Sequence, residues 1–439
     1  MQQETVISER QSASASQLWT FVHSSASRYW MIIAAFVLLS PSFALLTMRT
    51  EYHQNDLRTL ALPVLAFLVV IALAAFLQRP GRYRLLEGAK PTTLMLVTLF
   101  VGSMVVSLNG ADANPYLAQL NYFITLLQML FGAALWCLFR EVPELREKCL
   151  AAMACGLGLH VVIAYAFAVA MAGSTDFEWV RFGVGVTNIR HLGYIAVCLT
   201  GLAGGLYLAA QNPTDRRIFA GLFFLGTFFV MWSGGRGAFA AFVVQLVALG
   251  ALAPTERRWT FAAVATAITV AATIAAAIYV PDPRFGPDNI FFRINPMADG
   301  EADYLANRGE IWRQTMAMIP DRMWFGYGEG QFIGLVSATE QKLNHPHNLF
   351  LQLLFQWGVF GTLAVAAYLG ALVLPKIGNI LRAERVGLVA AGVAIGLGAL
   401  SMVDGPFFYS LPLSVFVLCI AALAASPAAG VASAAAPQG

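Results

Sequence analysis

The sequence predicts an all-α polytopic membrane protein with about twelve transmembrane helices and one large external loop. Charged residues make up 12% of the 439 residues, which is about half the share that is usual in soluble proteins, and hydrophobic residues make up 58%. A soluble protein of this size needs more polar and charged residues to cover its surface. The apolar residues also gather in runs of about 17–25, the length that a helix needs to cross the hydrocarbon core.

Twelve apolar segments have this length. Nine lie within residues 30–280: Trp30–Met48, Thr59–Gln78, Thr92–Leu108, Tyr116–Phe139, Cys149–Ala172, Asn188–Ala209, Arg216–Trp232, Arg236–Leu252 and Trp259–Val280. Three lie within residues 348–425: Asn348–Leu374, Val386–Val403 and Phe407–Ala425. The short connections Ser233–Gly235 and Asp404–Pro406 predict that spans seven and eight, and spans eleven and twelve, form hairpins.

The distribution of lysine and arginine predicts the orientation of these spans. If the N-terminus lies inside, the inner loops and the tail hold 16 basic residues, whereas the short outer loops hold Arg49, Arg58 and Arg181. Basic residues favour the cytoplasmic side. We therefore expect both terminal segments, residues 1–29 and 426–439, to be cytoplasmic, and the loop at residues 281–347 to be external. The C-terminal tail is rich in Ala, Ser and Pro, so we expect it to be disordered.

The external loop is too long to be a simple connection. Tyr304, Ile311, Trp312 and Met318 have helical spacing before Pro320, so residues 301–319 predict an amphipathic helix that can lie along the outer membrane surface. The loop holds nine acidic and six basic residues. It is therefore not a basic patch, and an anion site in it must be made by individually placed arginines.

The segment around the start of span ten has the most informative pattern. Pro346 suits the first turn of a helix, which places His347 and Asn348 at the N-terminal end of that span. On a continuous helix, Gly358 and Gly361 lie below His347 and slightly to either side of it, because they follow it by eleven and fourteen positions. This stripe predicts a groove for another helix or a lipid chain.

The chemistry of His347 suits proton transfer beside an anion. The free N–H groups of a helix N-terminus attract phosphate, and a histidine there can accept a proton near neutral pH. A histidine that merely caps the helix at the membrane interface is the alternative. We expect no metal site, because His345 and His347 lack an obvious third ligand.

Arginines at the external ends of the spans are candidates for binding phosphate oxygens, since a guanidinium can donate two parallel hydrogen bonds. Arg236 follows Ser-Gly-Gly at the turn between spans seven and eight, where the flanking glycines allow a bulky anion to approach. Arg308 lies on the predicted loop helix. Interaction of Arg236 with lipid head groups, and pairing of Arg308 with Glu310 or Asp303, are the alternatives.

Further candidate residues lie at two other external positions. Arg181 and Arg190 form a second external cluster with His191 at the start of span six. Asp404, at the turn between spans eleven and twelve, can orient a cation or a histidine, and a turn-forming aspartate is the alternative.

The sequence also lacks several functional signatures. It has no glycine-rich nucleotide loop and no dense aspartate cluster for Mg²⁺. The five cysteines lie in or beside apolar segments and make no metal-binding pattern. We therefore expect no cofactor and no nucleic-acid partner. A lipid-borne donor that is reached from outside fits better than a soluble nucleotide donor.

These residues resemble the O-antigen ligases (WaaL). His347 and Asn348, followed after nine residues by Gly358 and after two more by Gly361, match the H-N-x9-G-x-x-G pattern of that family. The twelve spans, the large loop before span ten, the S-G-G-R-G turn at Arg236 and the R-x-x-I-W segment at Arg308 are similar too. The superfamily also contains O-antigen polymerases and protein O-oligosaccharyltransferases.

The resemblance implies a C-type glycosyltransferase-like membrane fold in the bacterial inner membrane. It implies transfer of O-antigen from undecaprenyl pyrophosphate to lipid A–core on the periplasmic side, without a metal. In this reading His347 is the general base, Arg236 and Arg308 compensate the pyrophosphate charge, and Asn348 orients His347 or a phosphate. In-line attack inverts the anomeric centre. A polymerase, a protein-glycosylating enzyme and a transporter are the alternatives.

Overall fold

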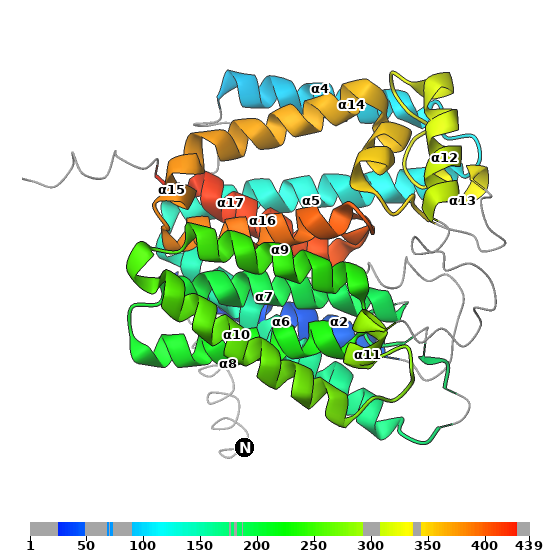
Figure 1. Ribbon diagram of the computed structural model, residues 1–439. Coiled ribbons are helices and arrows are strands. Elements are labelled where there is room, and N and C mark those ends of the chain that lie inside the picture. Colours follow the sequence, from blue (N-terminus) through cyan, green and yellow to red (C-terminus); the bar gives the residue numbers. More distant parts are fainter. Residues whose placement is uncertain are drawn as a thin grey trace, which may run out of the picture.

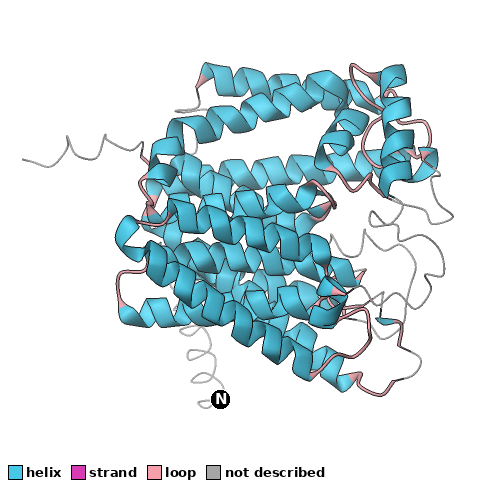
Figure 2. Ribbon diagram, in the orientation of Figure 1, coloured by secondary structure: helices cyan, strands magenta, loops and turns pink. Residues whose placement is uncertain are grey.

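Long helices make up the architecture of the protein (Figure 1). The computed structural model describes residues 25–48, 68–69, 71–72, 90–174, 177–179, 182–186, 188–292, 308–336 and 344–427. Throughout these ranges the regular structure is helical and no strand occurs (Figure 2). The predicted fold class, an all-α polytopic membrane protein, is confirmed.

Eleven of the twelve predicted spans have a helix among the described residues. They are α2 (Ser25–Leu46), α4 (Pro91–Leu108), α5 (Pro115–Glu141), α6 (Glu144–Ala170), α7 (Leu192–Ala209), α8 (Pro213–Trp232), α9 (Arg236–Leu252), α10 (Thr255–Ile278), α14 (Leu349–Val373), α16 (Arg385–Ser401) and α17 (Ser410–Ala425). Most of the second span, Thr59–Gln78, lies outside the described residues.

Seven of the helices in the described ranges are long and apolar enough to cross a membrane. Three further apolar helices, α9, α16 and α17, are shorter, and α8 carries Asp215, Arg216 and Arg217 near its start. Local sequence explains where several of these helices begin. Pro91, Pro115 and Pro213 occupy first-turn positions, where the missing N–H has no helical partner to lose.

The long helices run side by side, with α4 and α14 as a pair along one edge of the bundle (Figure 1). Helices α7 and α16 pack closely because glycines face one another in their interface. A Cβ atom at Gly201 would lie 2.9 Å from the backbone nitrogen of Val393, and one at Gly392 would lie 2.9 Å from the carbonyl oxygen of Gly201. Both predicted hairpins, α8–α9 and α16–α17, are formed.

Short helices gather at the end of the bundle where α14 begins. They include η2 (Ile189–His191), α11 (Gly286–Phe291), α12 (Arg308–Met318), η3 (Ile319–Arg322), α13 (Phe332–Leu335) and η5 (Pro406–Phe408). Helix α12 corresponds to the predicted loop helix, whose first residues, 301–307, lie outside the described part. It runs crosswise to the long helices (Figure 1). Its Ile311 is buried with Phe332 and Phe355, so this apolar face packs against the protein.

Helix α14 differs from the prediction in two ways. It begins at Leu349, so Pro346 precedes the helix rather than occupying its first turn. It is also interrupted at Gly358, whose φ of 61° and ψ of −167° are not helical. The predicted stripe of His347, Gly358 and Gly361 on one continuous helix is therefore wrong.

The backbone N–H and C=O groups around this break form hydrogen bonds with the backbone of residues 323–328. The N–H groups of Tyr327 and Gly328 donate to the carbonyls of Phe355 and Gln356 at 2.8 and 2.9 Å. In return, the N–H groups of Val359 and Phe360 donate to the carbonyls of Met323 and Trp324 at 2.8 and 3.2 Å. These four hydrogen bonds replace those that the break removes from the helix, since buried backbone groups must be paired.

The glycines at this junction are required by space. A Cβ atom at Gly358 would lie 2.4 Å from the backbone nitrogen of Phe325, and one at Gly361 would lie 2.7 Å from Oγ of Ser103 on α4. Both positions that were predicted to line an open groove are therefore filled by other parts of the chain. The absence of a side chain at these two glycines allows the 323–328 segment and α4 to pack directly against α14.

Candidate active site

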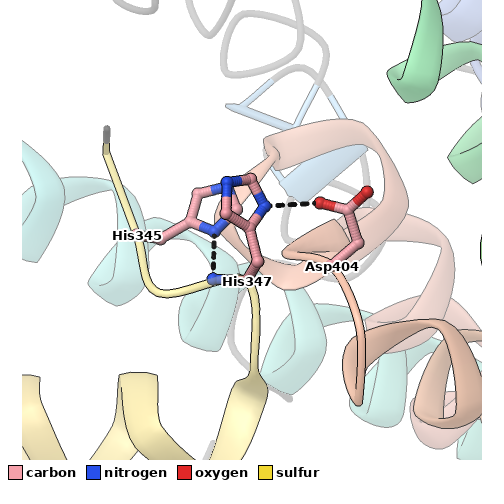
Figure 3. Close-up of side chains that lie close together, drawn as sticks. All are labelled: His345, His347 and Asp404. Atoms are coloured by element: carbon pink, nitrogen blue, oxygen red, sulfur yellow. Dashed lines mark hydrogen bonds and ion pairs between the residues drawn. The ribbon is translucent and has the colours of Figure 1, made fainter. Parts of the chain in front are cut away.

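The turn that follows α16 meets the segment that precedes α14 at one end of the bundle. There, Nδ1 of His347 lies 2.8 Å from Oδ1 of Asp404 (Figure 3). The same carboxylate oxygen accepts a hydrogen bond from the N–H of Gly405 at 3.0 Å. Of the two interpretations of Asp404, the structure favours the one in which it orients a histidine. It still forms part of the turn.

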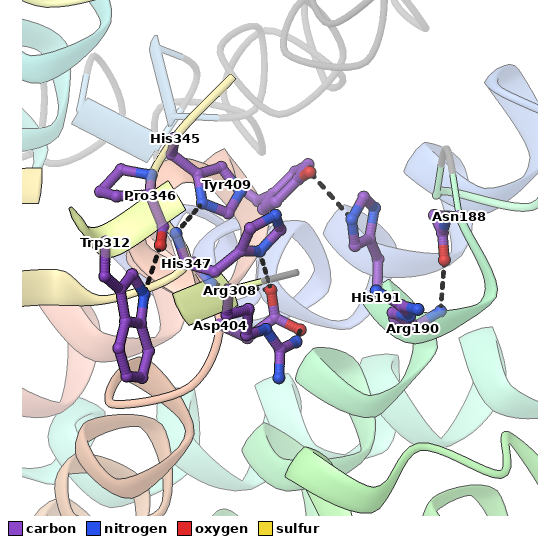
Figure 4. Close-up of polar contacts among 11 residues, drawn as sticks. Asn188, Arg190, His191, Arg308, Trp312, His345, Pro346, His347, Asp404 and Tyr409 are labelled. Carbon is purple, nitrogen blue, oxygen red and sulfur yellow. Dashed lines mark hydrogen bonds and ion pairs between the residues drawn. The ribbon is translucent and has the colours of Figure 1, made fainter. Parts of the chain in front are cut away.

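The backbone of His347 is held in a conformation that a residue with a side chain rarely adopts. Its φ is +55°. Its N–H donates to Nδ1 of His345 at 3.2 Å, and Nε1 of Trp312 donates to the carbonyl of Pro346 at 2.9 Å (Figure 4). Such a conformation costs about 1–3 kcal/mol and persists where the surroundings impose it, often at a functional site.

Asn348 connects the two sides of the site. Its Oδ1 accepts from the N–H of Leu351 at 3.1 Å, which makes it the N-cap of α14. Its Nδ2 donates to the carbonyl of Met402 at 3.1 Å. The amide therefore joins the start of α14 to the turn that carries Asp404, and it positions His347 through the backbone.

Arg308, at the start of α12, faces the other oxygen of Asp404. Its guanidinium nitrogen Nη2 lies 3.7 Å from Oδ2, and both side chains are largely buried. Glu310, which was a possible partner of Arg308, instead forms an ion pair with Arg313 at 2.6 Å. Asp303, the other possible partner, lies outside the described residues.

The structure brings three of the four predicted arginines into electrostatic contact. Burial lowers the pKa of Arg308, Asp404 raises it, and the positive charges of Arg190 and Arg236 lower it further. Like charges are costly when they are close together in a partly buried site, so this arrangement suits a polyvalent anion. Arg181 lies outside the described residues, and the structure does not test its position.

The glycines beside Arg236 have a different use from the one predicted. A Cβ atom at Gly234, whose φ is +68°, would lie 2.6 Å from the carbonyl oxygen of Arg284. Nδ2 of Asn289 also donates to the carbonyl of Gly234 at 2.9 Å. The prediction that these glycines leave room for an anion is therefore wrong at Gly234, because the 284–289 segment occupies that space.

The site keeps its carboxylate charged and one of its histidines neutral. Burial would raise the pKa of Asp404, but the hydrogen bond from His347 and the positive charge of Arg308 hold it well below its ordinary value. Burial lowers the pKa of His345 well below its ordinary value. His345 is thus a neutral acceptor for the His347 N–H.

The three residues offer ligand atoms that could hold a metal ion. One atom each of His345, His347 and Asp404 lie within 4.8 Å of one another. The argument that the two histidines have no third ligand is therefore wrong, because Asp404 supplies one. In this structure Nδ1 of each histidine already takes part in a hydrogen bond with another part of the site.

Sequence reasoning missed several residues that shape the site. Trp312 holds Pro346, and Tyr409 reaches Nε2 of His191 at 2.9 Å (Figure 4). The ring of Tyr409 also lies against that of His345, with centroids 6.2 Å apart. No spacing in the sequence relates these residues, since each comes from a different segment.

Residues 221–366 match the family model for O-antigen ligase. This segment is similar to the O-antigen ligase family. The match confirms the predicted resemblance and covers about a third of the chain. No curated protein matches the chain.

The O-antigen ligase segment includes most of the candidate site. Arg236, Arg308, His347 and Asn348 lie inside it, whereas Asp404 lies beyond its end. The match supports glycosyltransferase-like activity of the ligase and polymerase type, with polysaccharide–lipid substrates in general. It agrees with a multi-pass membrane protein.

Proposed function

We propose that the protein is an O-antigen ligase, which transfers O-antigen polysaccharide from undecaprenyl pyrophosphate to a sugar hydroxyl of lipid A–core. One observation carries this proposal. The His347–Asp404 pair adjoins Arg308, so a proton acceptor and a cation for a leaving pyrophosphate lie in one site. The family match at residues 221–366 supports the choice of reaction class.

The leaving group needs charge compensation more than protonation, because pyrophosphate is already a stable anion. The pyrophosphate charge is compensated by Arg308, Arg236 and Arg190. The N-terminus of α14 also favours an anion there. Arg308 exchanges its contact with Asp404 for phosphate oxygens when the donor binds. Arg181 remains a fourth candidate.

The attacking hydroxyl needs a base. His347 uses Nδ1 to contact Asp404, which leaves Nε2 to accept the acceptor proton as the oxygen attacks the anomeric carbon. The ionised carboxylate of Asp404 stabilises the imidazolium that forms. Attack opposite to the departing pyrophosphate inverts the anomeric centre, and no metal takes part.

The positive-inside pattern supports a definite topology. Residues 1–29 and 426–439 are cytoplasmic, residues 30–280 and 348–425 hold the spans, and the loop at residues 281–347 is periplasmic. The site then faces the periplasm from the inner membrane. Undecaprenyl-linked O-antigen and lipid A–core reach it from the surrounding membrane lipids.

A deletion strain tests this function. Loss of a ligase leaves bare lipid A–core on a lipopolysaccharide gel and O-antigen on the undecaprenyl carrier, and wild-type protein restores the ladder. We expect His347→Ala to reach the membrane in normal amounts without restoring it. Restoration by this variant would remove the proposed role of His347.

The same gel separates the alternatives. Core capped with a single repeat indicates a polymerase, whose acceptor is another lipid-linked repeat. An intact ladder with unmodified pilin-like proteins indicates a protein-glycosylating enzyme. A transporter typically carries ionisable groups near the midplane on broken helices. Here the candidate groups gather at one end of the bundle, which favours the enzyme.

A further inference from the structure

A large cavity separates the α4–α14 pair from α5 and α17. Its volume is about 1100 Å³. Along α5 its lining extends from Leu117 to Arg140, which corresponds to about 35 Å of helix and so to the full thickness of a hydrocarbon core. Leu349, the first residue of α14, lines one end, so that end of the cavity lies next to the candidate site.

The two ends of the cavity differ in charge. Lys90, Arg140 and Lys376 line the end away from the candidate site. Glu329 and the neutral polar side chain of Tyr409 line the end next to it. The lining therefore offers no lysine or arginine to an anionic group at the end that adjoins the candidate site.

Polar side chains form facing stripes in the outer half of this cavity. Asn121, Thr125 and Gln128 lie on one face of α5, since they are four and three residues apart, and all three line the cavity. Gln352 and Gln356 lie one turn apart on α14 and line it too. Polar groups at membrane depth are costly and usually serve a function.

Some of these polar groups are explained by helix packing. Nε2 of Gln128 donates to Oγ of Ser414 on α17 at 3.0 Å, which joins two helices. Another is not explained in this way. Oε1 of Gln352 is buried without a hydrogen-bond partner, and the residue is 6% exposed. Gln352 lines the cavity.

Glu329 adds a buried acid to the same region. Its carboxylate accepts from Oγ1 of Thr125 at 3.1 Å and from Nε1 of Trp357 at 3.2 Å. Carboxylates and side-chain amides are the groups that can bind several hydroxyls of one ring, because each offers more than one acceptor or donor. A neutral polyhydroxyl group therefore suits this lining better than a phosphate.

The position of this region relative to His347 indicates which substrate it serves. Arg308 and Asp404 lie on one side of His347 and Tyr409 lies on the other (Figure 4). Tyr409 lines the cavity, whereas Arg308 does not. In the proposed reaction the pyrophosphate occupies the arginine side, so the hydroxyl that attacks approaches from the cavity side.

We propose that the outer half of this cavity binds a sugar ring of the lipid-anchored acceptor, whose hydroxyls donate hydrogen bonds to the carboxylate of Glu329 and to Oε1 of Gln352. The lipid chain of the ligand extends into the apolar part of the cavity. This proposal rests on the proposed function for the role of the ligand. The binding of an alkyl-linked sugar does not depend on that role.

Binding is tested on the full-length protein in phosphatidylcholine nanodiscs with an octyl β-D-glucoside that carries a diazirine in its chain. We expect labelled peptides from α5 and α14, and competition by octyl β-D-glucoside but not by octyl phosphocholine. Gln352→Leu should reduce labelling by about tenfold. Thr98→Val, which removes a hydroxyl on the lipid-facing side of α4, should not. Labelling elsewhere, or equal competition by both compounds, would overturn the proposal.

Kinetics separate this proposal from the proposed function. We expect Gln352→Leu and Glu329→Gln to raise KM for the acceptor about tenfold while KM for the donor stays unchanged. A rise confined to the donor KM would assign the cavity to the donor and overturn the acceptor role. Specific sugar labelling in a protein without transfer activity would contradict the proposed function alone. Transfer activity without labelling would contradict the cavity proposal alone.

Discussion

Nδ1 of His347 and Oδ1 of Asp404 are 2.8 Å apart, although 57 positions separate the two residues in the chain. The contact links the segment before α14 to the turn after α16. It fixes which nitrogen of His347 faces the protein, and so leaves the other available for substrate. Asp404 also faces Arg308, which makes the carboxylate the centre of the site.

Asp404→Asn should lower kcat by about 10²–10⁴-fold, because the imidazole loses the charge that stabilises its protonated form. Acceptor KM should change little, since Asp404 acts on the acceptor through His347. In the double variant with His347→Ala the loss should be no larger than in His347→Ala alone. Asp282→Asn, which breaks an exposed pair with Arg284, is the control. Additive losses would show that the two residues do not act as a unit.

Arg308→Ala should raise KM for the lipid pyrophosphate donor by about 10–100-fold, since a charge-assisted contact is lost from a largely buried site. The measurement is steady-state transfer by purified protein at varied donor. Arg313→Ala is a matched control, because Arg313 lies on the same helix but is exposed and paired with Glu310. An equal effect of both variants would indicate general disruption of α12.

Gly358→Ala should destabilise the protein by about 2–5 kcal/mol, because alanine is strained at φ +61° and its Cβ would overlap the backbone of Trp324 and Phe325. The thermal unfolding midpoint of the purified protein measures this change. Gly102→Ala, on α4, adds a methyl group with no atom within 4 Å and should leave the midpoint nearly unchanged. A similar midpoint for both variants would contradict the described junction.

Glu329 should make stability depend on pH. Burial raises its pKa from 4.5 to about 7, so the folded state favours the protonated form. The unfolded chain loses this proton at lower pH than the folded protein. Stability should therefore fall as pH rises from about 4.5 to about 7, by an amount on the order of 3 kcal/mol. Glu329→Gln should remove this fall, as unfolding midpoints at pH 5 and pH 8 would show. A wild-type midpoint that rises across this range would reverse the sign and contradict the assignment.

Metal chelation should leave the transfer rate unchanged, because the proposed chemistry uses arginines for charge compensation. Added Zn²⁺ should inhibit, since ligand atoms of His345, His347 and Asp404 lie within 4.8 Å of one another and a bound metal would occupy the base. Rates with EDTA and with graded Zn²⁺ measure both effects. Loss of activity in EDTA with recovery on adding metal would require a different mechanism.

The sequence by itself determined the fold class and the position of most spans. Hydropathy and helix length report on each segment independently, so apolar runs such as Tyr116–Phe139 and Asn188–Ala209 are recognisable without knowing their neighbours. The pattern around His347 and Asn348 was recognisable for a similar reason. Its residues lie within one short segment, and the family match covers that segment.

The tertiary structure alone decided which residues meet. Asp404 is one aspartate in a turn until that turn meets the segment before α14, and Arg308 lacks its partner until α12 crosses the end of the bundle. The sequence did not predict the break at Gly358 either, because the hydrogen bonds that stabilise it come from residues 323–328. Long-range pairing depends on how whole helices pack, whereas periodicity within one segment carries no information about the partner that it will contact.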